Sequence, residues 1–388
     1  MPSPSARLDK LPAYIFAVIA DQINILRAEG HDVIRLDMGN PDMPPPDAIV
    51  EALCDSAKQP TNHGYTGYRG TPDFRQAVAK QYEKRFAVSL DPDKDVLPLI
   101  GSKEGIVNMA LAHIDTGDVA LIPDIGYPTY SMGTRLAGGE IYWMPLTAEN
   151  GFKPDVSQIP DDIVQKAKLL WVNYPNNPTS TFVDIEFYEE VAGFCNDNDI
   201  LLVSDNPYMD VTYDGNTACS ALQTSYGKNN VVELYSFSKS YNMGGWRLGT
   251  ALGSADAISN LLRVKSNVDT GHFHSIYDAG IVALQTPQSW IDKRNKIYQD
   301  RRDLVMEALP KIGLSAEVPN GSLYIWAKID RLDLQDYTDR ARNEAYVSTA
   351  PGDAYGPGGK GYVRISLAVK IEQLKEALVR LEKWYATI

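Results

Sequence analysis

Cysteine is scarce in this chain, and its spacing indicates neither disulfides nor a thiolate metal site. Three cysteines occur in 388 residues, Cys54, Cys195 and Cys219, far apart and odd in number. A disulfide framework needs pairs, and a thiolate metal site usually shows two cysteines close together. Unpaired thiols suit a reducing compartment, so we expect the protein in the cytoplasm.

Long hydrophobic runs are also missing. No stretch of about eighteen apolar residues occurs in the sequence, which excludes a predicted membrane-spanning helix. The N-terminal segment, MPSPSARLDKLPAYIF, lacks a continuous apolar core followed by a small-residue cleavage site. We therefore expect a soluble protein that is not exported.

Positive charge is in deficit. Lysine and arginine number 37 against 50 aspartates and glutamates, a formal net charge of −13. This excess of negative charge repels phosphate backbones and anionic membranes, so neither nucleic acid nor a membrane is an expected partner. With 44% hydrophobic and 22% charged residues, the composition is globular, and the length suffices for two domains.

Short apolar runs recur at intervals, with helical patterns between them. Buried parallel strands read as continuous apolar runs, and their alternation with helices is typical of an α/β domain with a largely parallel sheet. The runs that we interpret as strands are 119–123, 169–175, 200–205, 231–237 and 248–253.

The two ends of the chain follow a different pattern. Residues 13–29 predict an amphipathic helix that stops at Gly30, and 33–36 predict a short strand. After about residue 285 come a long polar helix (290–309), two strands (322–328 and 362–366) and a closing helix, as in a smaller α+β domain. We expect an arm and helix (1–40) packed on a small domain (286–388), beside a large domain (41–285).

A turn of small residues opens a helical pattern after the predicted strand that ends at Ile100. Ser102 and Lys103 lie in this turn, in the segment GSKEG. Free backbone N–H groups and the positive end of a helix dipole suit a phosphate at such a place. Taken alone, the segment is better explained by Ser102 as an ordinary helix cap.

A second candidate for phosphate binding is the segment SFSKSYNMGGWR, which also follows a predicted strand. The hydroxyls of Ser236 and Ser238 could orient a phosphate, and Arg247 could supply two-pronged charge. Lys239 is then free for another task. Because most lysines are simply solvated, this interpretation needs support from elsewhere in the chain.

Two more strand ends supply that support. Asp205 ends the most apolar strand, where a carboxylate is costly unless it meets a cation. Asn177 follows another strand, although alone it reads as an Asn-Pro turn. The carboxyl ends of parallel strands meet at one edge of the sheet. A phosphate clamp, an amide, an acid and a lysine at that edge indicate a pyridoxal phosphate site.

With this set of motifs, the chain resembles the fold-type I, class I and II aminotransferases over nearly its whole length. The resemblance implies that Lys239 carries the cofactor and moves the substrate proton, and that Asp205 binds the ring nitrogen. It implies that Asn177 and Tyr208 bind the ring hydroxyl and that Tyr127 stacks on the ring. Lys239, Asp205 and Tyr208 are the expected catalytic residues.

The resemblance also assigns the residues around the cofactor phosphate, which are Ser102, Lys103, Ser236, Ser238 and Arg247. Tyr65, in HGYTGYRGTPDFR, matches a tyrosine that reaches the phosphate of the neighbouring subunit. The resemblance therefore implies a homodimer whose active sites are completed across a two-fold interface.

Within the family, motifs such as LPAYIF, GSKEGIVN and KSNVDTG are most similar to LL-diaminopimelate aminotransferases and related bacterial enzymes. Arg364, in YVRISLA, matches the arginine that receives the substrate α-carboxylate, and Tyr14 and Gly39 match substrate-contacting positions. The resemblance implies amino transfer between a polar L-amino acid, similar to LL-diaminopimelate, and a 2-oxo acid such as 2-oxoglutarate, in amino acid biosynthesis.

The chain departs from the family pattern at two places. Ser180 stands where a glycine is usual, and 272–277 replaces an apolar run that borders the substrate pocket in relatives. His272 and His274 are therefore candidates for binding the distal end of the substrate, with Tyr277 beside them. Two histidines alone are a weak signal for a metal, and no metal site is expected.

Other functions remain open on the sequence. An enzyme of the same fold that ends in elimination, replacement or cyclisation is the main alternative, because 272–277 differs from the family. A cofactor-binding sensor would need an attached DNA-binding module, and the sequence shows none. A nicotinamide enzyme is disfavoured, because no Gly-x-Gly-x-x-Gly follows a predicted strand.

Overall fold

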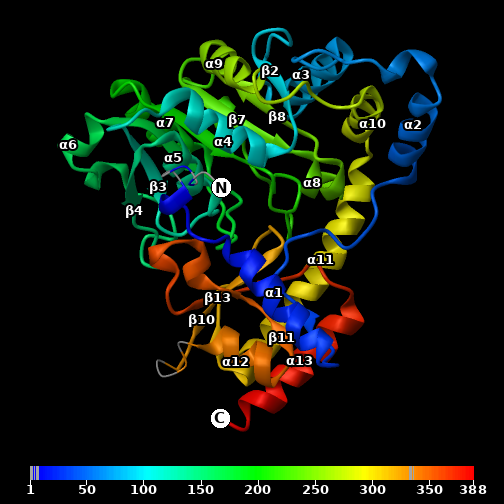
Figure 1. Ribbon diagram of the computed structural model, residues 1–388, viewed down its shortest axis with the longest axis vertical. Coiled ribbons are helices and arrows are strands. Elements are labelled where there is room, and N and C mark those ends of the chain that lie inside the picture. Colours follow the sequence, from blue (N-terminus) through cyan, green and yellow to red (C-terminus); the bar gives the residue numbers. More distant parts are fainter. Residues whose placement is uncertain (1–2, 4, 6–7, 332–333, 335) are drawn as a thin grey trace.

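The computed structural model describes the chain except for residues 1–2, 4, 6–7, 332–333 and 335. In this described part, the largest sheet has seven strands in the order β2-β8-β7-β6-β5-β3-β4 (Figure 1). Strand β8 runs antiparallel to both of its neighbours, and the other neighbours pair in parallel. In chain order, the strands are β2 (Val96–Leu99), β3 (Val119–Pro123), β4 (Glu140–Met144), β5 (Ala167–Val172), β6 (Leu201–Asp205), β7 (Val231–Ser236) and β8 (Gly249–Gly253).

Helices cover both faces of this sheet. Successive side chains of a strand point to opposite faces, so Leu169 and Trp171 of β5 pack with α4, α5 and α9, whereas Leu170 and Val172 pack with α3, α7 and α10. Because both faces are apolar, the central strands read as continuous apolar runs. The helices of this layer are α2 (Asp47–Ala57), α3 (Pro72–Phe86), α4 (Ser102–His113), α5 (Thr129–Ala137), α6 (Asp161–Val164), α7 (Ile185–Asp197), α8 (Phe237–Ser240), α9 (Ala255–Lys265) and α10 (His274–Leu284).

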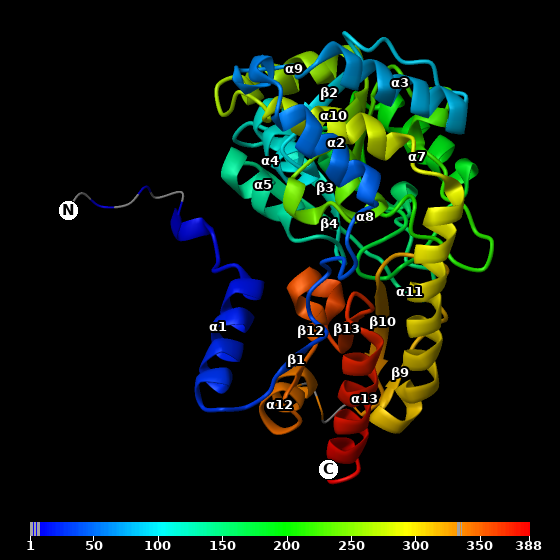
Figure 2. The ribbon, with the colours of Figure 1, turned by 90° about the vertical axis from the view of Figure 1, so that its right-hand side faces the viewer.

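A smaller antiparallel sheet lies below the large one, in the order β12-β13-β10-β9 (Figure 1). The long helix α11 runs from the upper layer down beside this sheet (Figure 2). Its buried residues Tyr298 and Val305 share a core with the sheet and with α13. The elements of this layer are α11 (Gln288–Ala308), β9 (Leu314–Ser315), β10 (Tyr324–Ile329), α12 (Tyr337–Glu344), β11 (Val347–Ser348), β12 (Ala350–Pro351), β13 (Tyr362–Ser366) and α13 (Ile371–Tyr385).

The N-terminal segment joins the smaller layer. Helix α1 (Ile15–Ala28) lies to one side of the molecule (Figure 2), and its Ile19 and Ile23 pack against Val33. Strand β1 (Ile34–Arg35) then pairs in parallel with β11. After β1 the chain continues to Gly39, which lies between the two layers.

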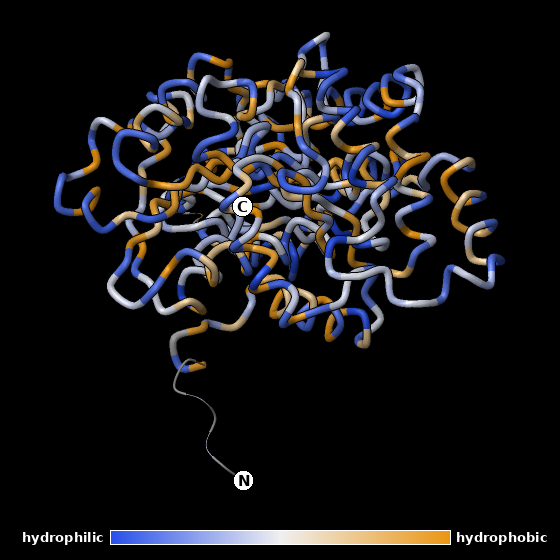
Figure 3. The backbone as a smooth tube through the Cα atoms, turned by 90° about the horizontal axis from the view of Figure 1, so that it is seen from above, coloured by the Kyte–Doolittle hydropathy of each residue, from blue (hydrophilic) through white to orange (hydrophobic). Residues whose placement is uncertain are grey.

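The structure confirms the predicted fold class, an α/β fold with a mostly parallel sheet and a smaller α+β part. Seen from above, hydrophobic and hydrophilic stretches alternate along the chain, and hydrophilic residues are frequent in the rim loops (Figure 3). The analysis of apolar runs missed β4, whose residues are mostly half-exposed. No helix in the described part of the chain is long and apolar enough to cross a bilayer.

Candidate active site

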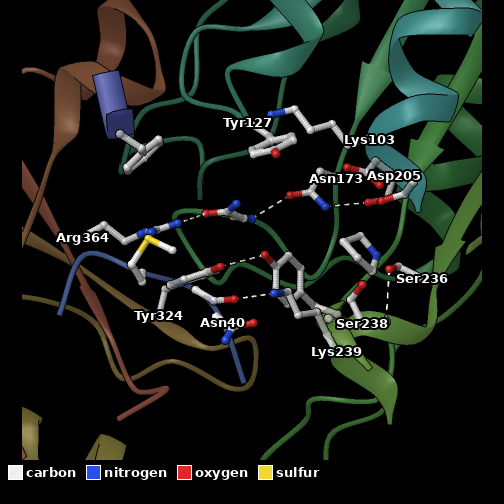
Figure 4. A pocket seen from close by; sticks show the side chains of 18 of the residues that line it. Asn40, Lys103, Tyr127, Asn173, Asp205, Ser236, Ser238, Lys239, Tyr324 and Arg364 are labelled. Atoms are coloured by element: carbon white, nitrogen blue, oxygen red, sulfur yellow. Dashed lines mark hydrogen bonds between the residues drawn. The ribbon is translucent and has the colours of Figure 1, made fainter. Parts of the chain in front are cut away.

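A cavity of about 370 Å³ lies where the carboxyl ends of β5, β6 and β7 face the smaller sheet (Figure 4). It brings together residues that are far apart in the sequence. Those expected from the sequence that line it are Tyr14, Gly39, Ser102, Lys103, Tyr127, Asn177, Asp205, Tyr208, Ser236, Ser238, Lys239, Arg247 and Arg364.

Lys239 projects into this cavity from the short helix α8, directly after β7 (Figure 4). Ser236 caps that helix, because its hydroxyl accepts from the Ser238 N–H at 3.3 Å. The Lys239 Nζ donates to the backbone carbonyl of Gly39. Burial, together with the guanidinium groups of Arg364 and Arg247, lowers the pKa of Lys239 to about 7. The amine is therefore neutral in a large share of molecules at neutral pH, which a nucleophile and a base both need.

Asp205 is buried at the end of β6, with 3% of its surface exposed. The Tyr130 hydroxyl donates to its Oδ2 at 2.7 Å, while its buried Oδ1 has no hydrogen-bond partner in the described structure. Burial raises the pKa of Asp205 to about 7, and the Tyr130 bond opposes that rise. A protonated ring nitrogen would satisfy the open oxygen and favour the carboxylate.

The cavity lining also includes groups that suit a phosphate. Helix α4 begins at Ser102, so its first backbone N–H groups are free of helical partners. Gly101 precedes it with φ +75°, and a Cβ there would lie 2.2 Å from the guanidinium of Arg247. Only a glycine leaves room for that guanidinium. The hydroxyl-bearing residues Ser236 and Ser238 complete this side of the cavity.

Asn177 and Tyr208 occupy the middle of the cavity, on loops that follow β5 and β6. The backbone N–H of Asn177 donates to Asn173 Oδ1 at 2.7 Å, which fixes the loop. The Tyr208 hydroxyl shares a hydrogen bond of 2.9 Å with Tyr324. Ser180 has φ +60°, the left-handed region that favours glycine, and its hydroxyl donates to the backbone carbonyl of Tyr324 at 2.8 Å. That bond compensates for the residue that replaces the usual glycine.

Arg364 enters the cavity from β13 of the smaller sheet (Figure 4). Its two terminal nitrogens donate to Asn177 Oδ1 at 2.9 Å and to the backbone carbonyl of Asp37 at 2.6 Å. The guanidinium lies 3.9 Å from the centre of the Tyr324 ring. Its buried Nε has no partner in the described structure. A fixed, incompletely paired guanidinium of this kind suits a carboxylate.

Three expected residues lie outside the cavity lining. Tyr65 is 91% exposed. His272 binds the backbone carbonyl of Arg247 at 2.8 Å, and His274 lies 3.5 Å from Asp278. A single chain therefore does not bring these three to the cavity. Among the described residues, no group of three or more histidine, cysteine, aspartate and glutamate side chains could hold a metal.

The sequence analysis missed several residues of the site, which are Phe16, Tyr130, Asn173, Tyr324 and Tyr355. Tyr130 had a usable signal, because it follows Tyr127 by three residues where a helix begins. Tyr324 and Tyr355 had none, since they come from the smaller layer and stand in no motif that follows a strand of the large sheet.

These observations fit pyridoxal phosphate. An amine whose pKa is lowered to about 7, a buried carboxyl group with one open oxygen, and a phosphate cradle formed by the start of α4 with Ser236, Ser238 and Arg247 match its aldehyde, ring nitrogen and phosphate. When bound, this cofactor supplies a ring that withdraws electrons from the α-carbon of an amino acid.

Comparisons with known proteins identify the family of this chain. The family model "Aminotransferase class I and II" matches residues 31–381. An LL-diaminopimelate aminotransferase from Moorella thermoacetica is 44% identical over 97% of both chains. The apo BacF structure from Bacillus subtilis superposes with a TM-score of 0.95 and 34% identity over 99% of this chain and 98% of that one. A probable N-succinyldiaminopimelate aminotransferase from Thermus thermophilus gives a TM-score of 0.89 and 36% identity, over 95% and 100% of the two chains. The chain therefore belongs to the class I and II aminotransferases and is a pyridoxal phosphate-dependent enzyme that transfers amino groups.

Proposed function

We propose that this aminotransferase takes its amino group from a polar L-amino acid similar to LL-diaminopimelate and passes it to a 2-oxo acid such as 2-oxoglutarate. The observation that carries the proposal is the cavity itself, where the incompletely paired Arg364 faces the same space as the amine of Lys239. An amino acid held by its α-carboxylate on Arg364 would present its α-carbon to that amine. The names of the most similar relatives support the substrate class.

Each residue of the site then has one task. Arg364 binds the α-carboxylate and orients the substrate, and Lys239 in its neutral form takes the proton from the α-carbon. Asp205 keeps its charge opposite the cofactor ring nitrogen. Asn177 and Tyr208 hold the ring hydroxyl, and Arg247 holds the phosphate at the start of α4.

A panel of amino donors tests the substrate class. We expect LL-diaminopimelate and other donors with a polar tail to convert bound pyridoxal phosphate to its pyridoxamine form about 5- to 100-fold more efficiently than alanine or leucine. The reason is that an aliphatic tail leaves polar groups of the cavity lining without hydrogen-bond partners. Stopped-flow absorbance of the cofactor measures each rate.

Two controls accompany the panel. Arg364→Gln should weaken all donors alike, because every donor carries an α-carboxylate. With 2-oxoglutarate present, new glutamate should appear in step with donor consumption. Equal efficiency for leucine and LL-diaminopimelate would refute the substrate class. A rearranged carbon skeleton without new glutamate would favour elimination, replacement or cyclisation, which nothing in the comparisons favours.

We also propose a homodimer with shared active sites. The segments that carry Tyr65 and Phe273 lie together, because the ring of Phe273 is 5.5 Å from that of His63 and Thr66 donates to the His272 carbonyl. Tyr65 is 91% exposed, Val268 64% and Phe273 41%. Apolar side chains gathered in this way are typical of an interface, and a second copy of the chain is the occupant we infer.

Mixing two inactive variants tests this assembly. Lys239→Ala lacks the amine, and Tyr65→Phe lacks the hydroxyl that we place on the partner's phosphate. If sites are shared, each heterodimer has one intact site, and an equal mixture should regain about a quarter of the wild-type activity. Activity after refolding the two chains together is the measurement, and each variant refolded alone is the control. A mixture as inactive as its components would show that Tyr65 does not serve the neighbouring site.

We place the enzyme in the cytoplasm. All three cysteines are free thiols in the structure, and Cys54 is exposed, which suits a reducing compartment.

A further inference from the structure

His272 lies outside the cavity but contacts it from behind, through Arg247. Its ring Nε2 is 2.8 Å from the backbone carbonyl oxygen of Arg247. A carbonyl only accepts hydrogen bonds, so Nε2 carries the hydrogen and donates. At this departure from the family pattern, the His272 side chain therefore contacts Arg247, a residue of the phosphate cradle, and does not line the cavity.

Arg247 needs such support. It has φ +59°, a left-handed backbone that a residue with a Cβ adopts at a cost. Its guanidinium donates to the Gly244 carbonyl at 3.0 Å and packs against Gly101. The direction of the Arg247 side chain depends on this backbone conformation, because the hydrogen bond that its guanidinium makes in the described structure goes to the nearby Gly244 carbonyl.

His272 is itself held in place. Its carbonyl accepts from Thr66 Oγ1 at 3.1 Å, and its N–H donates to the Tyr277 hydroxyl at 3.2 Å. The same hydroxyl lies 3.4 Å from the ring Nδ1, which accepts a hydrogen bond when the ring hydrogen is on Nε2. The preceding turn is fixed by Asp269, which pairs with the buried Lys265 at 2.7 Å.

The surroundings of His272 lower the pKa of its ring, and burial is the largest cause. Burial lowers its pKa, and the nearby cations Lys265 and Arg247 lower it further, against the opposite effects of the Arg247 carbonyl and Asp269. The bond to the Arg247 carbonyl requires a hydrogen on Nε2, which a neutral ring supplies in one of its two tautomers. The contact therefore persists at neutral pH without placing another cation beside the cradle.

We propose that His272 is a positioning residue for Arg247, and that its Nε2–H fixes the Arg247 peptide so that the guanidinium faces the cofactor phosphate. The inference rests on the proposed assignment of Arg247 to that phosphate. It gives the divergent segment 272–277 a role in holding the cofactor.

The test compares pyridoxal 5′-phosphate with pyridoxal, which lacks the phosphate. Dissociation constants of both are measured for the full-length protein after the cofactor has been removed. His272→Leu should weaken pyridoxal phosphate about 3- to 10-fold, the effect of one lost hydrogen bond, and leave pyridoxal unchanged. His272→Gln, whose amide can still donate, should restore most of the affinity. His274→Leu is the matched control, because His274 contacts Asp278 and not Arg247.

Arg247→Met separates this inference from the proposed function. If Arg247 binds the phosphate, this variant lowers the preference for pyridoxal phosphate over pyridoxal, and adding His272→Leu to it has no further effect. If Arg247→Met lowers this preference but His272→Leu binds both ligands as the wild type does, the inference about His272 is overturned and the phosphate assignment of Arg247 stands. An equal loss of both ligands in His272→Leu would also overturn the inference. An unchanged preference in Arg247→Met would overturn the phosphate assignment itself.

Discussion

Replacing Lys239 by alanine should abolish amino transfer, with a loss of at least about 10⁴-fold, because it removes the amine that α8 places in the cavity beside the Gly39 carbonyl. The protein should still fold, since a buried amine whose pKa falls to about 7 is held at a cost and contributes little to stability. It should also retain pyridoxal phosphate without a covalent bond, because the phosphate cradle is untouched.

Mass spectrometry identifies the lysine that carries the cofactor. After borohydride reduction of the wild-type holoenzyme, the cofactor mass should lie on the peptide that contains Lys239. Lys103 is the competing candidate, because it lines the same cavity, but its ammonium lies over the Tyr14 ring at 4.5 Å from the ring centre. The cofactor mass on the Lys103 peptide, or measurable turnover by the alanine variant, would refute the assignment.

The cofactor half of the site could be predicted from the sequence because parallel strands deliver their carboxyl ends to one edge. Asp205 ends a strand, and Ser102 and Lys239 lie in helices that begin just after one, so their positions in the chain imply their place in space. The apolar runs before them showed where the strands lie. For these residues, the position of a motif in the sequence therefore predicted its position in the fold.

The substrate half could not be predicted in this way. Arg364 and Tyr324 come from neighbouring antiparallel strands, β13 and β10, whose position below the large sheet depends on packing with α11 and α13. No local pattern encodes that packing. For His272, the chain position near the pocket was informative, but its side chain turns toward the Arg247 carbonyl instead of the cavity. The limits of the three domains stay a prediction.

Asp205→Asn should leave the fold intact and depress the rate of amino transfer by about 10³-fold or more, because an amide cannot hold the charge opposite the ring nitrogen. Stability should not fall, since the wild-type protein keeps a buried carboxyl with an unpartnered Oδ1 and a pKa raised to about 7. Thermal unfolding without cofactor measures the stability, and single-turnover absorbance of the cofactor measures the rate.

Tyr130→Phe provides a graded comparison at the same carboxyl group. The Tyr130 hydroxyl donates to Asp205 Oδ2 at 2.7 Å and so favours the carboxylate over the acid. Removing it should raise the pKa of Asp205, so a larger fraction is protonated near pH 7 and the acid limb of the pH–rate profile moves to higher pH. Asp205→Asn, which has no carboxyl to titrate, should stay slow throughout that range. Near-normal turnover in Asp205→Asn, or an acid limb that does not move in Tyr130→Phe, would show that the charge of Asp205 does not control the reaction.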